Sequence, residues 1–251
     1  MSAFARYDVV GTEVSAVSMR ALIETVAGWR GDGQVHHVCF ADVNSVIQAR
    51  DNPAMRSALA AADVVSPDGT PLMLVGRLLH GRTVSKTSGP DFLEAFCAAT
   101  AKTGTRHFFL GGGPGVAASL ASQLAERYPG LVVAGSYSPP RFPLSEAQND
   151  EMLGFIEAAK ADVVWVGLGA PKQEIWMAQN RHRLNGLTML GVGAAFDFSA
   201  GRVKRAPRWM QKSGTEWLYR ISQEPKRLLG RYASTIPRFL TLVLLQMVRL
   251  G

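Results

Sequence analysis

Apolar residues in the middle of the chain form short continuous runs, and longer amphipathic stretches separate these runs. The runs occupy residues 107–110, 131–134, 162–167 and 187–192. The stretches between them have helical periodicity and cover residues 116–127, 145–160 and the segment that starts at Pro171. Ser145 and Gln148 form the capping-box pattern that opens a helix. Strands that are apolar at every position are buried on both faces, which is typical of a parallel sheet flanked by helices.

The first hundred residues show the same alternation less regularly. The pattern predicts helices over 15–30, 44–50, 53–61, from 70 onward and over 90–102, with strands at 37–40 and 63–65. We therefore expect an α/β fold with a Rossmann-like, mostly parallel sheet and helices on both faces.

The amino-acid composition excludes several classes of protein. With 251 residues, 47% hydrophobic and 19% charged, it is neither wholly disordered nor a multispan membrane protein. Two cysteines without a CxxC pattern exclude a disulfide framework and a cysteine zinc site. The N-terminus lacks the continuous apolar segment of a signal peptide, so we expect the bulk of the chain in the cytosol.

Charge is distributed very unevenly along the chain. Residues 201–251 carry eleven Lys and Arg against two Glu, a net charge of +9, whereas residues 1–200 carry −2. We therefore expect an α/β body over 1–200 and a basic helical C-terminal appendage over 201–251. The appendage suits an anionic partner, such as a nucleic acid, a phosphorylated substrate or a membrane surface, although a solvated basic face is the plainer alternative.

The chain ends in an apolar segment, residues 237–250. Because spanning a bilayer takes about 20 apolar residues, we expect this segment to lie in a membrane surface or to pack on a partner. An ordinary buried C-terminal helix is the alternative.

Polar residues gather in four loops that follow predicted strands, at 42–44, 67–69, 111–115 and 169–174. Ligands of open α/β sheets bind at the carboxyl ends of the strands, so these loops are candidates for the site. In the third loop, Gly111, Gly112 and Gly113 precede a helix, and Val116 breaks the GxGxxG pattern of dinucleotide-binding enzymes, which disfavours a dehydrogenase. Phosphate binding at the helix N-terminus and a turn needed only for close packing both remain open.

Other catalytic signatures are missing from the sequence. It has no Walker loop, no GxSxG elbow, no HExxH and no Asp-x-Asp pair, so ATP-dependent phosphoryl transfer, acyl chemistry and metal-dependent catalysis are disfavoured. Asp68, in a Pro-Asp-Gly turn after a strand, is the best candidate for a general base, and Asp197 is the second. Pro-Asp-Gly is also ordinary turn chemistry. Lys172, Gln173 and Glu174 offer a cation, an amide and a carboxylate, or simply a solvated first turn of a helix.

Several longer motifs make the chain recognisable. They are Asn44, Ala62-Asp63 with Asp68-Gly69, Gly89-Pro-Asp91, Leu110 to Gly115, Tyr128-Pro129, Val166-Gly-Leu-Gly-Ala-Pro-Lys-Gln-Glu174, Gly191 to Gly201, Arg205-Ala-Pro207 and Glu216-Trp-Leu-Tyr-Arg220. In these residues the chain resembles the WecG/TagA/CpsF family of bacterial glycosyltransferases (glycosyltransferase family 26) over roughly residues 36–231.

This resemblance implies inverting transfer of a sugar from a UDP-sugar donor to a polyprenyl-diphosphate-linked sugar acceptor, in the synthesis of exopolysaccharide, common antigen or teichoic acid. It places Asp68 on the catalytic base, Gln173 on a cleft residue, and Arg205, Arg208 and Arg220 on arginines suited to diphosphate. Two positions depart from the family pattern. Asp42 stands where the family has Thr, and Lys86 where it has Arg, which removes bidentate geometry.

We therefore assign three groups of site residues. The catalytic group is Asp68, Asn44 and Asp42; the donor and nucleotide group is Gly111, Gly112, Gly113, Lys172, Gln173, Glu174 and Asp197; the acceptor diphosphate group is Lys86, Arg205, Arg208 and Arg220. We expect no cofactor and no metal, because arginines and helix-terminal amides can carry the diphosphate charge.

The expected partners are the donor, the lipid-linked acceptor and an anionic membrane surface, with a homo-oligomer left open. This places the protein peripherally on the cytoplasmic face of the bacterial inner membrane. The rival interpretation is a non-catalytic nucleotide- or nucleic-acid-binding α/β protein with a cationic tail. We disfavour nucleic acid because the apolar segment that ends the chain suits a membrane better.

Overall fold

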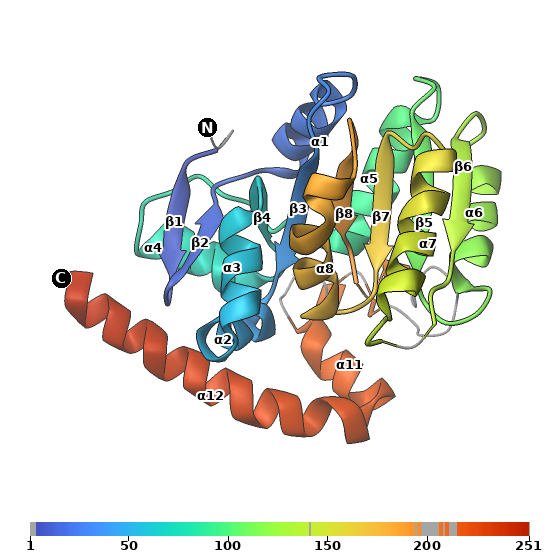
Figure 1. The fold of residues 1–251 in the computed structure, drawn as a ribbon. Helices are drawn as coiled ribbons and strands as arrows, with labels where there is room; N and C mark the ends of the chain where they lie inside the picture. The colour runs from blue at the N-terminus through green and yellow to red at the C-terminus, as the bar shows by residue number, and fades with distance from the viewer. Residues whose placement is uncertain are drawn as a thin grey trace.

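The computed structural model describes residues 4–140, 142–193, 195–196, 206–207, 209–210 and 215–250. A central sheet lies between two layers of helices, and a long C-terminal helix runs along one end of this body (Figure 1). The predicted α/β architecture is confirmed.

The central sheet has six strands, all parallel, in the order β4-β3-β8-β7-β5-β6. Its strands are β3 (His36–Ala41), β4 (Val64–Pro67), β5 (Arg106–Gly111), β6 (Val132–Tyr137), β7 (Val163–Gly167) and β8 (Thr188–Gly191). The last strand in the chain, β8, lies in the middle of the sheet. The early strands β3 and β4 lie on one side of it, and β7, β5 and β6 lie on the other side. The carboxyl ends around β3, β8 and β7 therefore form the crevice where such sheets bind ligands.

Helices cover both faces of the sheet because alternate strand residues point to opposite sides. One apolar core takes Cys39, Val65 and Val166 from the strands, and the other takes Val38, Phe40 and Trp165. The first core is covered by α2 (Val43–Asp51), α3 (Pro53–Ala61), α4 (Thr70–Leu78), α7 (Glu146–Ala158) and α8 (Lys172–Asn180). The second is covered by α1 (Met19–Gly28), α5 (Gly89–Thr100) and α6 (Val116–Arg127). A short 3-10 turn, η1 (Arg181–Arg183), follows α8.

The N-terminal part of the chain differs from the sequence prediction. A two-stranded antiparallel hairpin, β1 (Arg6–Val9) and β2 (Thr12–Ser15), precedes the first helix. Residue 15, expected to begin a helix, instead ends β2, and α1 begins after Ser18, whose side chain accepts a hydrogen bond from the Ala21 N–H. The hairpin escaped prediction because its turn is Val10-Gly11, and Val10 adopts a positive φ of 45° that β-branched residues rarely take.

Residues 216–250 form helices α11 (Glu216–Gln223) and α12 (Pro225–Leu250). The expected apolar segment 237–250 is only the second half of α12, because the helix continues through Pro237. That the segment lies in a membrane surface or packs on a partner therefore stays a prediction, and the helix that contains it is longer than expected. By length and composition, Leu228–Arg249 could cross a membrane, and 17% of its most apolar window is buried in the body.

Polar contacts fasten α12 to the body at two places. The Arg238 guanidinium donates to both carboxylate oxygens of Asp51, at the end of α2. Near the other end of the helix, the Gln246 side chain accepts from the Val10 N–H and donates to the Asp8 carbonyl, each at 2.9 Å. Between these contacts, Phe239 is buried in the first core. The helix therefore lies across the end of the body where the sheet's carboxyl ends emerge (Figure 1).

Candidate functional site

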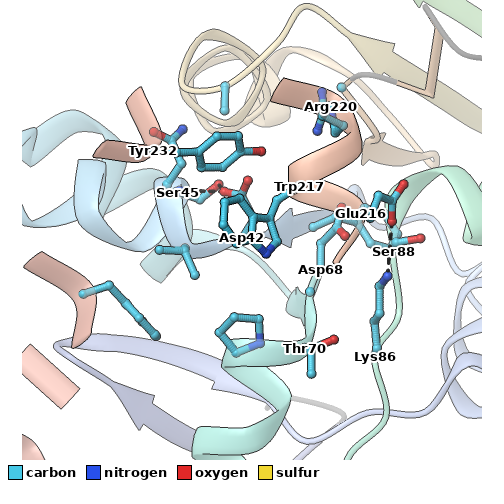
Figure 2. Close-up of a pocket in the computed structure, with 18 of the residues that line it drawn as sticks. Asp42, Ser45, Asp68, Thr70, Lys86, Ser88, Glu216, Trp217, Arg220 and Tyr232 are labelled. Carbon is cyan, nitrogen blue, oxygen red and sulfur yellow. Dashed lines mark hydrogen bonds and ion pairs between the residues drawn. The ribbon is translucent and has the colours of Figure 1, made fainter. Parts of the chain in front are cut away.

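A cavity of about 830 Å³ opens at the carboxyl ends of the strands. Its polar half is lined by the loops after β3, β4, β7 and β8 and by α11 (Figure 2). The site residues predicted from sequence that line it are Asp42, Asn44, Asp68, Lys86, Gly112, Gln173, Glu174 and Arg220. The structure thus brings together residues that are up to 178 positions apart in the chain.

Two acidic residues, Asp42 and Asp68, directly follow the ends of the neighbouring strands β3 and β4. The register pairs Ala41 with Pro67, and the Asp68 N–H donates to the Ala41 carbonyl at 2.8 Å. Asp42 and Asp68 therefore follow paired positions of β3 and β4. Asp42 is also the N-cap of α2, because one carboxylate oxygen accepts from the Ser45 N–H at 2.8 Å and from the Ser45 hydroxyl at 2.9 Å.

Asp68 has the electrostatic environment of a general base. Its pKa is raised from 3.8 to about 7, first by burial and then by the negative charges of Asp42 and Glu216. The Lys86 ammonium and the Gly89 N–H, which donates to Asp68 over 3.4 Å, act in the opposite direction. A carboxylate with a pKa near neutrality can accept a proton and still be ionised in much of the population at pH 7.

Gln173 and Glu174 are buried residues that line the cavity. The Gln173 side-chain amide donates to the Gly191 carbonyl and to Glu174, each at 2.9 Å, and its oxygen accepts from the Gly169 N–H at 3.2 Å. Both donor hydrogens are thus used within the protein, so Gln173 braces the ends of β7 and β8 as well as facing the cavity. Burial raises the pKa of Glu174 to about 7, and the hydrogen bond from Gln173 lowers it.

The glycine loop packs closely against the neighbouring strand end. A Cβ on Gly111, whose φ is 137°, would lie 2.4 Å from the Gly167 carbonyl oxygen, and the Gly112 N–H donates to that oxygen at 3.1 Å. Gly112 lines the cavity, whereas Gly111 and Gly113 do not. Close packing therefore accounts for Gly111, and the N-terminus of α6 remains a candidate phosphate site beside Gly112.

Lys172 does not join the other predicted residues. Its side chain is exposed, and its ammonium lies 5.9 Å from the centroid of the Phe142 ring, outside the cavity lining. Three other predicted residues, Asp197, Arg205 and Arg208, lie outside the described part of the chain.

The C-terminal helices contribute residues that sequence reasoning did not select. Glu216 is the first residue of α11, and its carboxylate lies 3.4 Å from the Lys86 ammonium. Figure 2 marks this ion pair with a dashed line. Arg220, one turn further along α11, also lines the cavity. From α12 come Arg231 and Tyr232. Glu216 belongs to the same sequence motif as Arg220. It was not selected because an acidic residue is a poor ligand for diphosphate, and the neighbouring sequence gives no sign of its partner Lys86.

Side chains that could hold a metal ion are not clustered in the described ranges: no three His, Cys, Asp or Glu residues there have a suitable arrangement. Among the residues that the structure describes, the cations that line the cavity are Lys86, Arg220 and Arg231.

The chain matches the model of the family described as "Glycosyl transferase WecG/TagA/CpsF family" over residues 7–251. Because the match covers nearly the whole sequence, the chain belongs to this family, whose members are glycosyltransferases of cell-surface polysaccharide synthesis.

Proposed function

We propose that this enzyme transfers a sugar, with inversion, from a UDP-sugar to a sugar linked to polyprenyl diphosphate. The observation that carries the proposal is Asp68, which lines the cavity at a strand end with its pKa raised to about 7. An acceptor hydroxyl must lose a proton as it attacks, and Asp68 is placed to receive it.

The transfer is a single displacement. The acceptor oxygen forms a bond to the anomeric carbon, and the bond from that carbon to the UDP oxygen breaks with its electron pair on UDP. The hydroxyl proton passes to Asp68. Negative charge develops on the diphosphate leaving group, and Arg220 and the backbone N–H groups at the start of α6 are the groups that we expect to stabilise it.

Lys86 takes a different part in this proposal. Its ammonium lies 3.4 Å from Glu216 and lowers the pKa of Asp68. A lysine presents a single point charge where a bidentate arginine would make two parallel hydrogen bonds. We therefore assign Lys86 to the acceptor diphosphate as a charge partner, beside the base.

The transfer assay uses purified protein, a panel of UDP-sugars and polyprenyl-diphosphate-linked sugars, with UDP release and product mass as readouts. We expect one donor and one acceptor class to give turnover, and the product to have the anomeric configuration opposite to that of the donor. Retention of configuration would contradict the single displacement, and turnover with a different class of nucleotide sugar would contradict the donor assignment.

We also propose that the protein works on the cytoplasmic face of the inner membrane as a peripheral protein. Leu244, Leu245 and Val248 near the end of α12 are exposed large apolar residues that do not line the cavity. The surrounding segment is strongly basic. An apolar helix face with nearby cations binds anionic lipid surfaces.

The membrane assay is flotation with phosphatidylglycerol vesicles. The double variant Leu244→Glu/Val248→Glu should lose most of its binding. Ala118→Glu/Ser122→Glu adds the same charge at the same spacing on exposed positions of α6, and should bind like the wild type. Equal binding by all three proteins would contradict the assignment of this face.

A further inference from the structure

The cavity that contains Asp68 has a second half that is almost entirely apolar. It continues from the polar half into a groove whose two walls are α4 and α12. The wall residues are Pro71, Leu74, Val75, Leu78 and Leu79 from α4 and its C-cap, and Ile236, Phe239, Leu240, Val243 and Met247 from α12. We call this the α4–α12 groove. Catalytic groups and groove thus belong to one continuous space.

The α12 wall is a single helical stripe. From Tyr232 to Met247 its lining residues recur every three or four positions, with Phe239 and Leu240 as one adjacent pair, which places them on one face of the helix. Fifteen residues of helix extend over roughly 22 Å. The groove is therefore long enough to hold an extended chain.

Nothing in the described chain covers this apolar surface fully. Leu78 is 76% exposed and Leu240 is 55% exposed, although both line the groove. The two walls do not close on each other, because α12 packs along α2 and is fastened by Arg238 to Asp51. Exposed apolar surface next to a catalytic cavity marks a ligand site.

Two aromatic residues lie at the start of the groove. Trp217 of α11 and Tyr232 of α12 have ring centroids 5.9 Å apart, and both line the cavity near Asp42 (Figure 2). Trp and Tyr side chains suit positions where one end is polar and the other apolar. On one side of them lie Lys86 and Arg220, which suit an anionic head group; on the other side lies the apolar groove.

We propose that the α4–α12 groove binds the polyprenyl chain of the acceptor and thereby places its diphosphate and sugar beside Asp68. This inference rests on the proposed function. A long apolar chain with an anionic head matches a long apolar groove that ends at cations. Membrane lipid is as apolar as the groove, so in a membrane the groove mainly positions the polyprenyl chain. Its affinity for the chain is therefore measured best in water.

The test is isothermal titration calorimetry in detergent-free buffer with dimethylallyl, geranyl and farnesyl diphosphate, which carry one, two and three isoprene units, below their aggregation concentrations. Each fully buried methylene gives up to about fourfold in affinity. We expect farnesyl diphosphate to bind at least about 10-fold more tightly than dimethylallyl diphosphate, with a negative heat-capacity change.

Matched variants locate the effect. Leu74→Gln/Leu240→Gln makes each wall more polar, and should reduce the chain-length effect to less than about threefold while leaving dimethylallyl diphosphate binding unchanged. Leu218→Gln/Leu229→Gln makes the same change at side chains that are 47% and 58% exposed and do not line the cavity. It should keep the full effect. Because all four side chains are substantially exposed, circular dichroism should show wild-type folding.

Two outcomes would overturn the groove assignment. They are equal binding of the three diphosphates by the wild type, or a full chain-length effect in the groove variant. The proposed function fails separately. Length-dependent binding without sugar transfer to any lipid-linked acceptor would support the groove and contradict the proposed transfer reaction.

Discussion

Replacing Asp68 by Asn should lower catalysis and stabilise the fold at alkaline pH. The side chain is buried enough to raise its pKa from 3.8 to about 7, so above pH 7 the folded protein holds a carboxylate in an unfavourable environment. Asn has nearly the same shape and no charge. We expect turnover to fall about 100-fold or more, which is the usual contribution of a positioned general base.

The sign and size of the stability effect follow from proton linkage. Between pH 4 and pH 7 the folded state retains the Asp68 proton that the unfolded state has released, so the wild-type free energy of unfolding falls as pH rises. The full shift corresponds to at most about 4 kcal/mol. Because the side chain opens onto the cavity, solvent screens part of this, and we expect about 2 kcal/mol, or about 4–8 °C in Tm.

The assay is thermal unfolding of both proteins at pH 5 and pH 8, alongside transfer activity. The Tm of Asp68→Asn should exceed that of the wild type at pH 8, and the difference should shrink at pH 5. Asp150→Asn removes the same charge from an exposed position on α7 and should show no such pH-dependent gain. Identical Tm differences at the two pH values would refute the raised pKa, and near-wild-type turnover would refute Asp68 as the base.

Three further predictions concern the charges around Asp68. The kcat/KM of the wild type should rise with pH to a plateau above about 7. Glu216→Gln should move the midpoint of this rise to lower pH, and Lys86→Met should move it to higher pH; midpoint shifts in the same direction would contradict this. Arg220→Ala should lower kcat/KM by about 10-fold or more through loss of diphosphate binding, whereas Arg56→Ala, an exposed arginine of α3, should leave it unchanged. Transfer should persist in excess EDTA; complete loss that Mg²⁺ or Mn²⁺ restores would show a metal requirement.

The sheet was predictable from sequence because its evidence is local. Continuous apolar runs such as 162–167 identify strands, and the Ser145 capping box, present in the structure, identifies the start of α7. The rule that ligands bind at carboxyl ends then selected the loops that contain Asp42 and Asp68. These inferences need only short windows of sequence and a general property of α/β sheets.

The remainder of the site depends on contacts that no short window contains. Glu216 pairs with Lys86 across 130 positions, and its effect on Asp68 appears only when α11 lies over the strand ends. Asp42 was selected as a catalytic carboxylate, yet Asp-x-x-Ser is equally an N-cap pattern, and its bonds to Ser45 show that it serves the helix. The Asp42 side chain can cap α2 and also face the cavity, because its bonds to Ser45 use one carboxylate oxygen and leave the second one available.

The C-terminal helix shows most clearly why pattern alone was insufficient. From sequence, the apolar segment 237–250 is interpreted as a short helix that lies in a membrane surface or packs on a partner. Proline inside a helix removes a backbone hydrogen bond, so the pattern gives no reason to extend the helix across Pro237. The structure continues α12 through Pro237, and its neighbours account for this: Phe239 is buried in the core, and Arg238 binds Asp51. Tertiary contacts on one face therefore offset a local penalty. In the folded protein, the apolar residues of α12 divide into a face that lines the groove and an exposed face that we propose binds lipid.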